Sequence, residues 1–170
     1  LSPYAAISQM FGSKNSFHIT PSAGLRLYTS NLFEDKAAPQ AGLVLGYNNS
    51  NLAFNYSRGV NYPSPVVLQG LLANKTSLPS GLNTKDIHPE VVDHYEVSLS
   101  HNQPGLFTVS ATAFHDDGRD RLRAYMATAG RAPTADFFTS STAEYKIDGL
   151  ELSGSLTPTE NLELFAGATW

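Results

Sequence analysis

Residues 41–58 decide the fold, and they read AGLVLGYNNSNLAFNYSR. Two runs of alternating residues flank a short polar link at 48–51. The large apolar members of the two runs are Leu43, Leu45, Tyr47, Leu52, Phe54 and Tyr56. A period of two puts one set of side chains on each face of a strand. The stretch therefore predicts two antiparallel strands that are joined by a tight hairpin.

The same alternation recurs on both sides of this hairpin. It covers residues 95–100, 107–113, 150–156 and 162–170, and weaker candidates lie around 4–11 and 17–29. The total is about eight strands, and no segment shows the capped, periodic pattern of a helix. We therefore predict an all-β, antiparallel fold.

The connections between these strands alternate in length. The short ones are 48–51, 102–105 and 157–161, and the long ones are 31–40, 61–90 and 116–142. When the strands are laid antiparallel, every short link falls at one end of the sheet. Outer-membrane barrels have short periplasmic turns and long outer loops. The pattern therefore favours an up-and-down transmembrane β-barrel, of which about eight strands are present.

Composition agrees with a wall between lipid and water. Only 15% of the 170 residues are charged, against roughly 25% in soluble domains. No apolar run approaches the roughly 18 residues of a membrane helix, so a closed sheet is the remaining way to span a bilayer. The net charge of −4 argues against a nucleic-acid partner, which normally needs a basic patch.

The two predicted faces differ in chemistry. One carries mostly Ser, Thr, Asn, Gly and Glu, as expected for a wet lumen. The other is apolar and ends in aromatic residues that suit a membrane-interface girdle: Tyr28, Tyr47, Tyr56, Tyr95 and Trp170. Periodicity alone fits a large soluble antiparallel sheet equally well.

Three stretches go beyond this general pattern. They are NYSRGVNYPSPVVL at 55–68, HPEVVDHYEV at 88–97, and YKIDGLEL at 145–152 followed by TPTENLEL at 157–164. Their order and spacing resemble the barrel of a TonB-dependent receptor over roughly residues 22–170. The resemblance implies an outer-membrane location and uptake of a metal chelate or similar small ligand. A siderophore-type iron complex is the leading candidate. It also implies contact with outer-membrane lipid, and coupling to the TonB system through other parts of the protein.

The resemblance covers the barrel alone. Residues 1–170 contain no recognisable plug domain or TonB box, and about eight strands compare with about 22 in a transporter barrel. We therefore expect residues 1–170 to be part of one β-barrel domain. A passive outer-membrane pore or autotransporter-type barrel, and a soluble β-sandwich binding module, are the alternative functions.

The candidate ligand-binding residues lie in the predicted long connections. Guanidinium groups bind carboxylate or catecholate ligands, and also lipid phosphates, through a planar fork. The candidates are Tyr62, Lys75, His88, Arg119, Arg121, Arg123, Tyr125 and Arg131. Glu96 and Glu151 are expected on the lumen side. Ordinary solvation of a loop or a lumen would also explain all of these residues.

No catalytic residues, metal site or cofactor are expected. The run HDDGRD at 115–120 contains possible metal ligands, but it lacks the spacing of a calcium loop. Asp-Asp-Gly at the end of a strand is typical of a turn. The sequence therefore predicts a protein that is not an enzyme.

Overall fold

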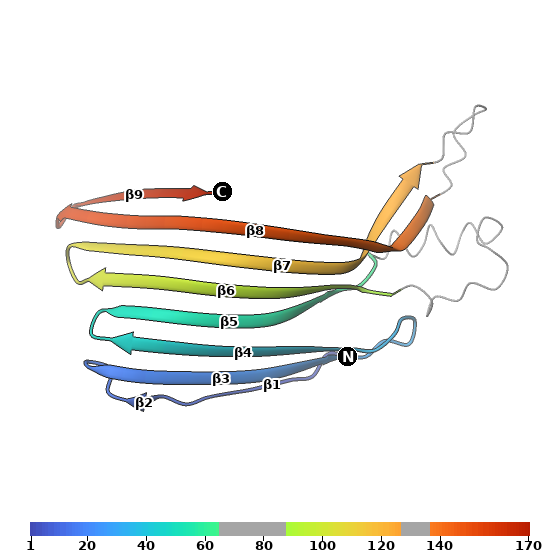
Figure 1. Ribbon diagram of the computed structural model, residues 1–170, viewed down its shortest axis with the longest axis horizontal. Helices are drawn as coiled ribbons and strands as arrows, with labels where there is room; N and C mark the ends of the chain where they lie inside the picture. The colour runs from blue at the N-terminus through green and yellow to red at the C-terminus, as the bar shows by residue number, and fades with distance from the viewer. Residues whose placement is uncertain (65–87, 127–136) are drawn as a thin grey trace.

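The computed structural model describes residues 1–64, 88–126 and 137–170, and these residues form one antiparallel sheet (Figure 1). Its strands are β1 (Tyr4–Ser8), β2 (Phe11–Gly12), β3 (Phe17–Tyr28), β4 (Lys36–Tyr47), β5 (Ser50–Asn61), β6 (Glu90–Gln103), β7 (Phe107–Met126), β8 (Phe137–Thr159) and β9 (Leu162–Thr169). Within the described ranges, no helix is long and apolar enough to cross a membrane.

The strands follow one another across the sheet in chain order, from β1 to β9. The short strands β1 and β2 both pair with β3, so they share one edge of the sheet. Nine strands therefore make eight rows, in agreement with the predicted number. No ladder joins β1 to β9 among the described residues, so the sheet is open, as expected for part of a larger barrel.

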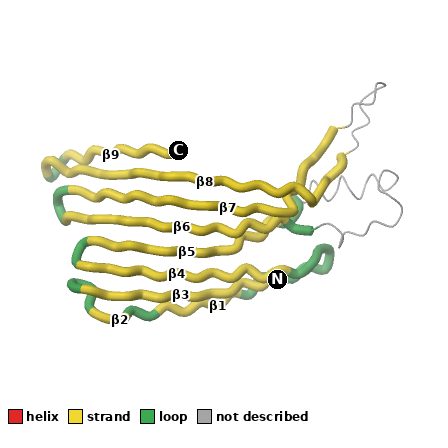
Figure 2. Tube along the Cα trace, viewed as in Figure 1, coloured by secondary structure: helices red, strands yellow, loops and turns green. Residues whose placement is uncertain are grey.

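Connection lengths alternate as predicted (Figure 2). We call the end with the links 48–49, 104–106 and 160–161 the turn end. The opposite end, with 29–35, 62–89 and 127–136, is the loop end. Asn48 has a φ of 51° and Gly105 a φ of 72°, a conformation that Asn and Gly tolerate best. These residues allow the reversals at the turn end to be tight.

Two predicted long connections are wrong in their bounds. Residues 36–40 of the predicted connection 31–40 belong to β4. Residues 116–126 and 137–142 belong to β7 and β8, which continue past the loop end of the neighbouring strands (Figure 1). The Asp-Asp-Gly run suits a turn by composition, but here it lies within the ladder. Asp116 bonds across to His94 on β6, with 2.6 Å between Oδ1 and Nδ1. Cross-strand partners thus override the local turn preference.

The register assigns each side chain to one of two faces. The apolar face carries Ile19, Leu43, Leu45, Leu52, Phe54, Val97, Leu99, Ala113, Leu150 and Leu152. The polar face carries Ser22, Asn55, Glu96, Ser98, Ser110, Thr112, Glu151 and Ser153. Among the described hydrophobic residues only Phe33, Ala38 and Val91 are buried. A single sheet without a core and with one exposed apolar face is suited to contact with lipid.

Four of the five predicted girdle residues lie on the apolar face. Tyr47 is at its turn end, and Tyr56 pairs with Tyr95 midway along their strands, next to the charged pair of Arg58 and Asp93. Trp170 exchanges backbone hydrogen bonds with Leu150, one row nearer the turn end than Tyr95. Tyr28 is a correction, because it pairs with Lys36 and shares the polar face with Arg26, two residues away.

Candidate functional site

A β-bulge near Asp120 separates two arginines that are only two positions apart. The register shifts between Gly118 and Arg121, and Asp120 has a φ of 59°. An extra residue in one strand turns the following side chain to the other face. Arg119 therefore lies on the apolar face and Arg121 on the polar face. The prediction that the arginines gather in one loop is wrong for these two, which lie in β7 and diverge.

Arg119 joins an ion cluster above the tyrosine pair of the apolar face. Asp93 accepts hydrogen bonds from Nε and Nη2 of Arg58 at 2.8 and 3.0 Å, and also from Arg119. Its Oδ1 further accepts a bond from the Tyr56 hydroxyl at 2.7 Å. Only 7% of the Asp93 side chain is exposed, so two guanidinium groups share one shielded carboxylate.

Arg121 faces the other way and stacks on a tyrosine. Its guanidinium carbon lies 5.0 Å from the centre of the Tyr145 ring. The Tyr145 hydroxyl donates to Glu90 Oε1 at 3.0 Å, and Asn61 Nδ2 donates to Glu90 Oε2 at 3.2 Å. A row of polar groups thus runs from β5 to β8 at the loop end of the polar face.

Gly118 makes this row possible. A Cβ at this position would lie 2.2 Å from Cζ of Tyr145. The Tyr145 ring therefore lies directly on the backbone of β7, and this position lets it reach Glu90 on β6. At Gly59, on the same face, a Cβ would meet only a carbonyl oxygen of Val92 at 3.9 Å.

A second arginine on this face was missed by sequence reasoning. The Arg26 guanidinium carbon lies 5.3 Å from the Tyr4 ring centre and 5.9 Å from that of Tyr28. Gln40 Nε2 donates to the Tyr4 hydroxyl at 2.5 Å. These residues line a hollow of about 360 Å³. The two-residue spacing of Arg26 and Tyr28 was visible in the sequence, but the approach of Tyr4 depends on the register.

The arginines of the two faces differ in their partners. Within the described residues, neither Arg26 nor Arg121 forms an ion pair with a carboxylate, whereas Arg58 and Arg119 both bind Asp93. Guanidinium groups on aromatic rings keep donors free at their edges. The polar face therefore presents two guanidinium groups that can bind an anionic ligand.

Tyr62 and His88 connect two loops through Glu34. The Tyr62 hydroxyl donates to the backbone oxygen of Glu34 at 2.9 Å, and His88 Nδ1 lies 2.9 Å from Glu34 Oε2. Hydrogen bonds from Lys36, at 2.8 Å, and from His88 hold the pKa of Glu34 below its usual value. Partial burial raises the pKa of Tyr62. Both predicted ligand contacts thus have structural partners here, and ligand binding by them stays a prediction.

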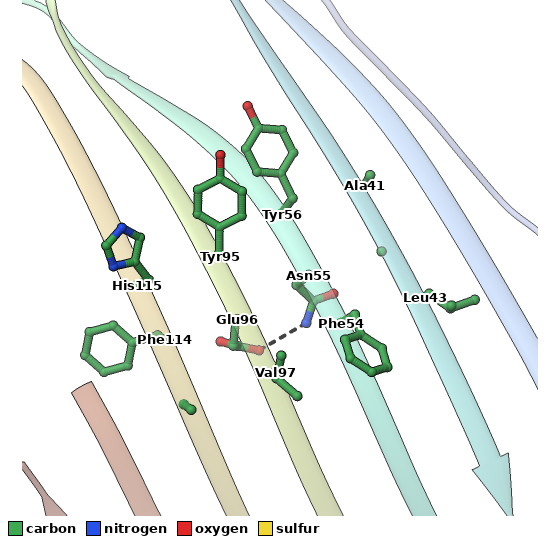
Figure 3. A pocket seen from close by; sticks show the side chains of 12 residues that line it. Ala41, Leu43, Phe54, Asn55, Tyr56, Tyr95, Glu96, Val97, Phe114 and His115 are labelled. Atoms are coloured by element: carbon green, nitrogen blue, oxygen red, sulfur yellow. Dashed lines mark hydrogen bonds between the residues drawn. The ribbon is translucent and has the colours of Figure 1, made fainter. Parts of the chain in front are cut away.

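Glu96 and Glu151 lie on the polar face. Asn55 Nδ2 donates to Glu96 Oε1 at 3.0 Å (Figure 3), and Glu151 lies in the register between Thr112 and Thr169. This bond to the neighbouring strand accounts for the observed position of Glu96. Contact of either carboxylate with a ligand stays a prediction.

The remaining candidates are only partly placed. Arg123 and Tyr125 occupy β7 positions that pair with Ser140 and Phe138. Lys75 and Arg131 lie outside the described residues. Ligand contact by these four residues therefore stays a proposal.

The possible metal ligands of residues 115–120 alternate between faces. His115 binds Asp148 on the apolar face, with 2.6 Å between Nδ1 and Oδ1, while Asp116 binds His94 on the polar face. In the part of the chain that the structure describes, no group of three His, Cys, Asp or Glu residues is arranged to hold a metal ion.

This open antiparallel sheet, with an apolar face, a polar face and alternating connection lengths, defines part of an outer-membrane β-barrel. Residues 11–170 match the family described as TonB dependent receptor-like, beta-barrel. The chain belongs to this family, whose members are outer-membrane proteins.

Solved structures show the same fold. The FrpB iron transporter from Neisseria meningitidis superposes with a TM-score of 0.66 and 16% identity, over 99% of this chain and 25% of that one. The copper transporter OprC gives 0.59 and 14%, over 99% and 28%. The alcaligin outer-membrane receptor FauA from Bordetella pertussis gives 0.54 and 15%, over 99% and 30%.

The chain thus spans between a quarter and a third of each solved protein that it resembles. No curated protein sequence matches it.

Proposed function

We propose that this chain forms part of the wall of a receptor that takes up a siderophore-type iron complex, or a similar small anionic ligand, with energy from the TonB system. In this proposal Arg26 and Arg121 contact the ligand from the polar face. The observation that carries it is the pair of guanidinium groups that lie on tyrosine rings without a carboxylate partner among the described residues.

The chemistry of these two positions suits such a ligand. A guanidinium group binds carboxylate or catecholate oxygens through two parallel hydrogen bonds. The adjacent tyrosine rings offer flat surfaces against which planar ligand groups can pack. Arg58 and Arg119 are less suitable, because their donors already bind Asp93 and they face the opposite way.

Two further considerations support the proposal. An iron transporter, a copper transporter and an alcaligin receptor have the fold of this chain. Family membership favours a TonB-coupled receptor over a passive pore or an autotransporter-type barrel. We propose additional ligand contacts at the loop end from Tyr62, Lys75, His88, Arg123, Tyr125 and Arg131. Glu96 and Glu151 are proposed to line the lumen.

Ligand binding by the intact receptor tests the proposal. Binding of an anionic ferric tris-catecholate complex, a neutral ferric tris-hydroxamate complex and Cu²⁺ is measured by quenching of protein fluorescence. Arg26→Ala and Arg121→Ala are each expected to weaken binding of the anionic complex about tenfold, as for loss of one charge-assisted contact. They should affect the neutral complex less.

Arg119→Ala is the matched control, since it removes the same charge from the same strand but on the apolar face. It should leave binding unchanged. Equal losses for Arg119→Ala and Arg121→Ala would contradict the assignment to the polar face. Tight binding of Cu²⁺ alone would contradict the iron-chelate proposal.

A further inference from the structure

His94 and Glu96 lie two residues apart on the polar face of β6. His94 Nε2 and Glu96 Oε2 are separated by 3.7 Å, which is too long for a hydrogen bond. Within the described residues, Glu96 is hydrogen-bonded through its other oxygen, Oε1. A nitrogen and an oxygen atom thus face one another across a small gap on the lumen side of the sheet.

The His94 ring is fixed by contacts on its other side. Its Nδ1 lies 2.6 Å from Asp116 Oδ1 on β7. Because a carboxylate only accepts hydrogen bonds, Nδ1 carries the proton and Nε2 of the neutral ring keeps its lone pair. The ring also stacks on Phe114, with 6.1 Å between the ring centres. Phe114 in turn lies on the backbone of Gly149, where a Cβ would come within 2.2 Å of its Cζ.

Glu96 is held in a similar way. Asn55 Nδ2 on β5 donates to Oε1 at 3.0 Å (Figure 3), which leaves Oε2 available. Metal-binding histidines and carboxylates commonly have such outer partners, which orient the coordinating atoms. The side chains of His94 and Glu96 are 34% and 29% exposed, so an ion can reach the gap from the lumen.

The size of the gap suits a transition-metal ion. Bonds of about 2.0–2.2 Å to nitrogen and oxygen place two ligand atoms about 3.4 Å apart in a tetrahedral site. The observed 3.7 Å is slightly longer, and a small rotation of the Glu96 side chain would remove the difference. Imidazole with carboxylate favours Zn²⁺ and similar ions over Ca²⁺ and Mg²⁺, which prefer oxygen ligands.

The charge of this face also favours a cation. The polar face of β6 to β8 carries four carboxylates and, among the described residues, one Arg or Lys side chain. These are Glu90, Glu96, Asp116 and Glu151, against Arg121. Arg121 lies at the loop end, beyond Asp116. The excess of negative charge attracts a divalent cation to this part of the lumen side.

We propose that His94 Nε2 and Glu96 Oε2 bind one Zn²⁺ ion, with water in the remaining positions. Asp116 and Asn55 are positioning residues, because they hold the two ligands without touching the ion. Two protein ligands predict weak, reversible binding, unlike the tight capture of a transported metal. The site is independent of the proposed function, since His94 is four residues, roughly 13 Å, from Glu90 at the loop end.

Isothermal titration calorimetry of the intact receptor with Zn²⁺ tests this proposal. The number of Zn²⁺ ions bound per receptor is compared between the parent protein and its variants. His94→Gln and the isosteric Glu96→Gln should each abolish the binding of one ion. Asp116→Ala should weaken binding of the same ion about tenfold. Asp116→Asn, which keeps an acceptor for Nδ1, should restore part of the affinity.

His115→Gln serves as the control. His115 makes the same 2.6 Å bond to an aspartate, Asp148, but on the apolar face, and it has no second carboxylate partner among the described residues. This variant should bind as much Zn²⁺ as the parent protein. Equal Zn²⁺ binding by the parent, His94→Gln and Glu96→Gln, or loss of the same ion in His115→Gln, would overturn the site. Displacement of this Zn²⁺ by Ca²⁺ at equal concentration would indicate a carboxylate site without imidazole, and would also overturn it.

Discussion

The two faces of this sheet hold their arginines in different ways. On the apolar face, Arg58 and Arg119 share the shielded carboxylate of Asp93. On the polar face, Arg26 and Arg121 lie on tyrosine rings. A charge beside lipid is costly without a partner, whereas a charge in a wet lumen is solvated and stays free for a ligand. Arg119 and Arg121 are only two positions apart in the sequence, yet they have different partners. The face on which an arginine lies therefore determines its partner.

A new charge on each face gives the largest expected effect. Val97→Arg puts a guanidinium group on the apolar face, and Ser98→Arg puts one on the polar face of the same strand. The first should lower the free energy of unfolding by about 2–4 kcal/mol, and the second by much less. Denaturant unfolding of the intact receptor in lipid vesicles measures both. Equal losses would mean that the two faces meet the same solvent.

Removing an existing acid from each face gives a smaller effect. Asp93→Asn leaves two guanidinium groups at the lipid boundary without a counter-ion, and the expected cost is about 2 kcal/mol after allowance for their partial exposure. Glu90→Gln keeps an acceptor for Tyr145, so its cost should stay below about 1 kcal/mol. The same unfolding measurement compares them. A larger cost for Glu90→Gln would reverse the proposed distinction.

Glu34 is also a carboxylate bonded to basic side chains, but it lies in a solvent-exposed loop. Its loss is therefore expected to change stability least. Bonds from Lys36 and His88 lower the pKa of Glu34 from its usual 4.5. Because the folded pKa is depressed, the stabilisation is complete well above 4.5 and is lost as the pH falls through the lower folded value. Hydrogen exchange of residues 29–35 should therefore show weaker protection only in that acid range.

Glu34→Gln is the control for this pH effect. It should show at neutral pH the reduced protection that the parent protein shows only in acid. Loss of protection in the parent protein near neutral pH would instead assign the effect to another group.

Much of the fold could be predicted because it depends on local patterns. Alternation at positions such as Leu43, Leu45 and Tyr47 determines strands and faces by geometry alone. Connection lengths then order the strands, since tight links force antiparallel neighbours. The candidate site was harder to predict, because most of its contacts cross between strands.

Three errors illustrate this limit. Asp116 belongs to a composition that favours a turn, but it pairs with His94 on β6 and with Ile147 on β8 and so lies in a strand. The bulge near Asp120 left no recognisable sequence signal, yet it determines the faces of Arg119 and Arg121. Arg26 was overlooked because its neighbour Tyr4 is distant in sequence and is brought close by pairing.

The bulge near Asp120 also changes how insertions and deletions act on this strand. In β7 below it, even-numbered residues such as Thr112 face the lumen side, and beyond it the odd-numbered Arg121 does. Deletion of Asp120 would remove the extra residue and leave Arg121 on the lumen side of a regular strand, because Arg121 would then take the even position directly after Arg119. The number of residues between Gly118 and Arg121, together with the bulge that accommodates them, therefore determines the face of Arg121.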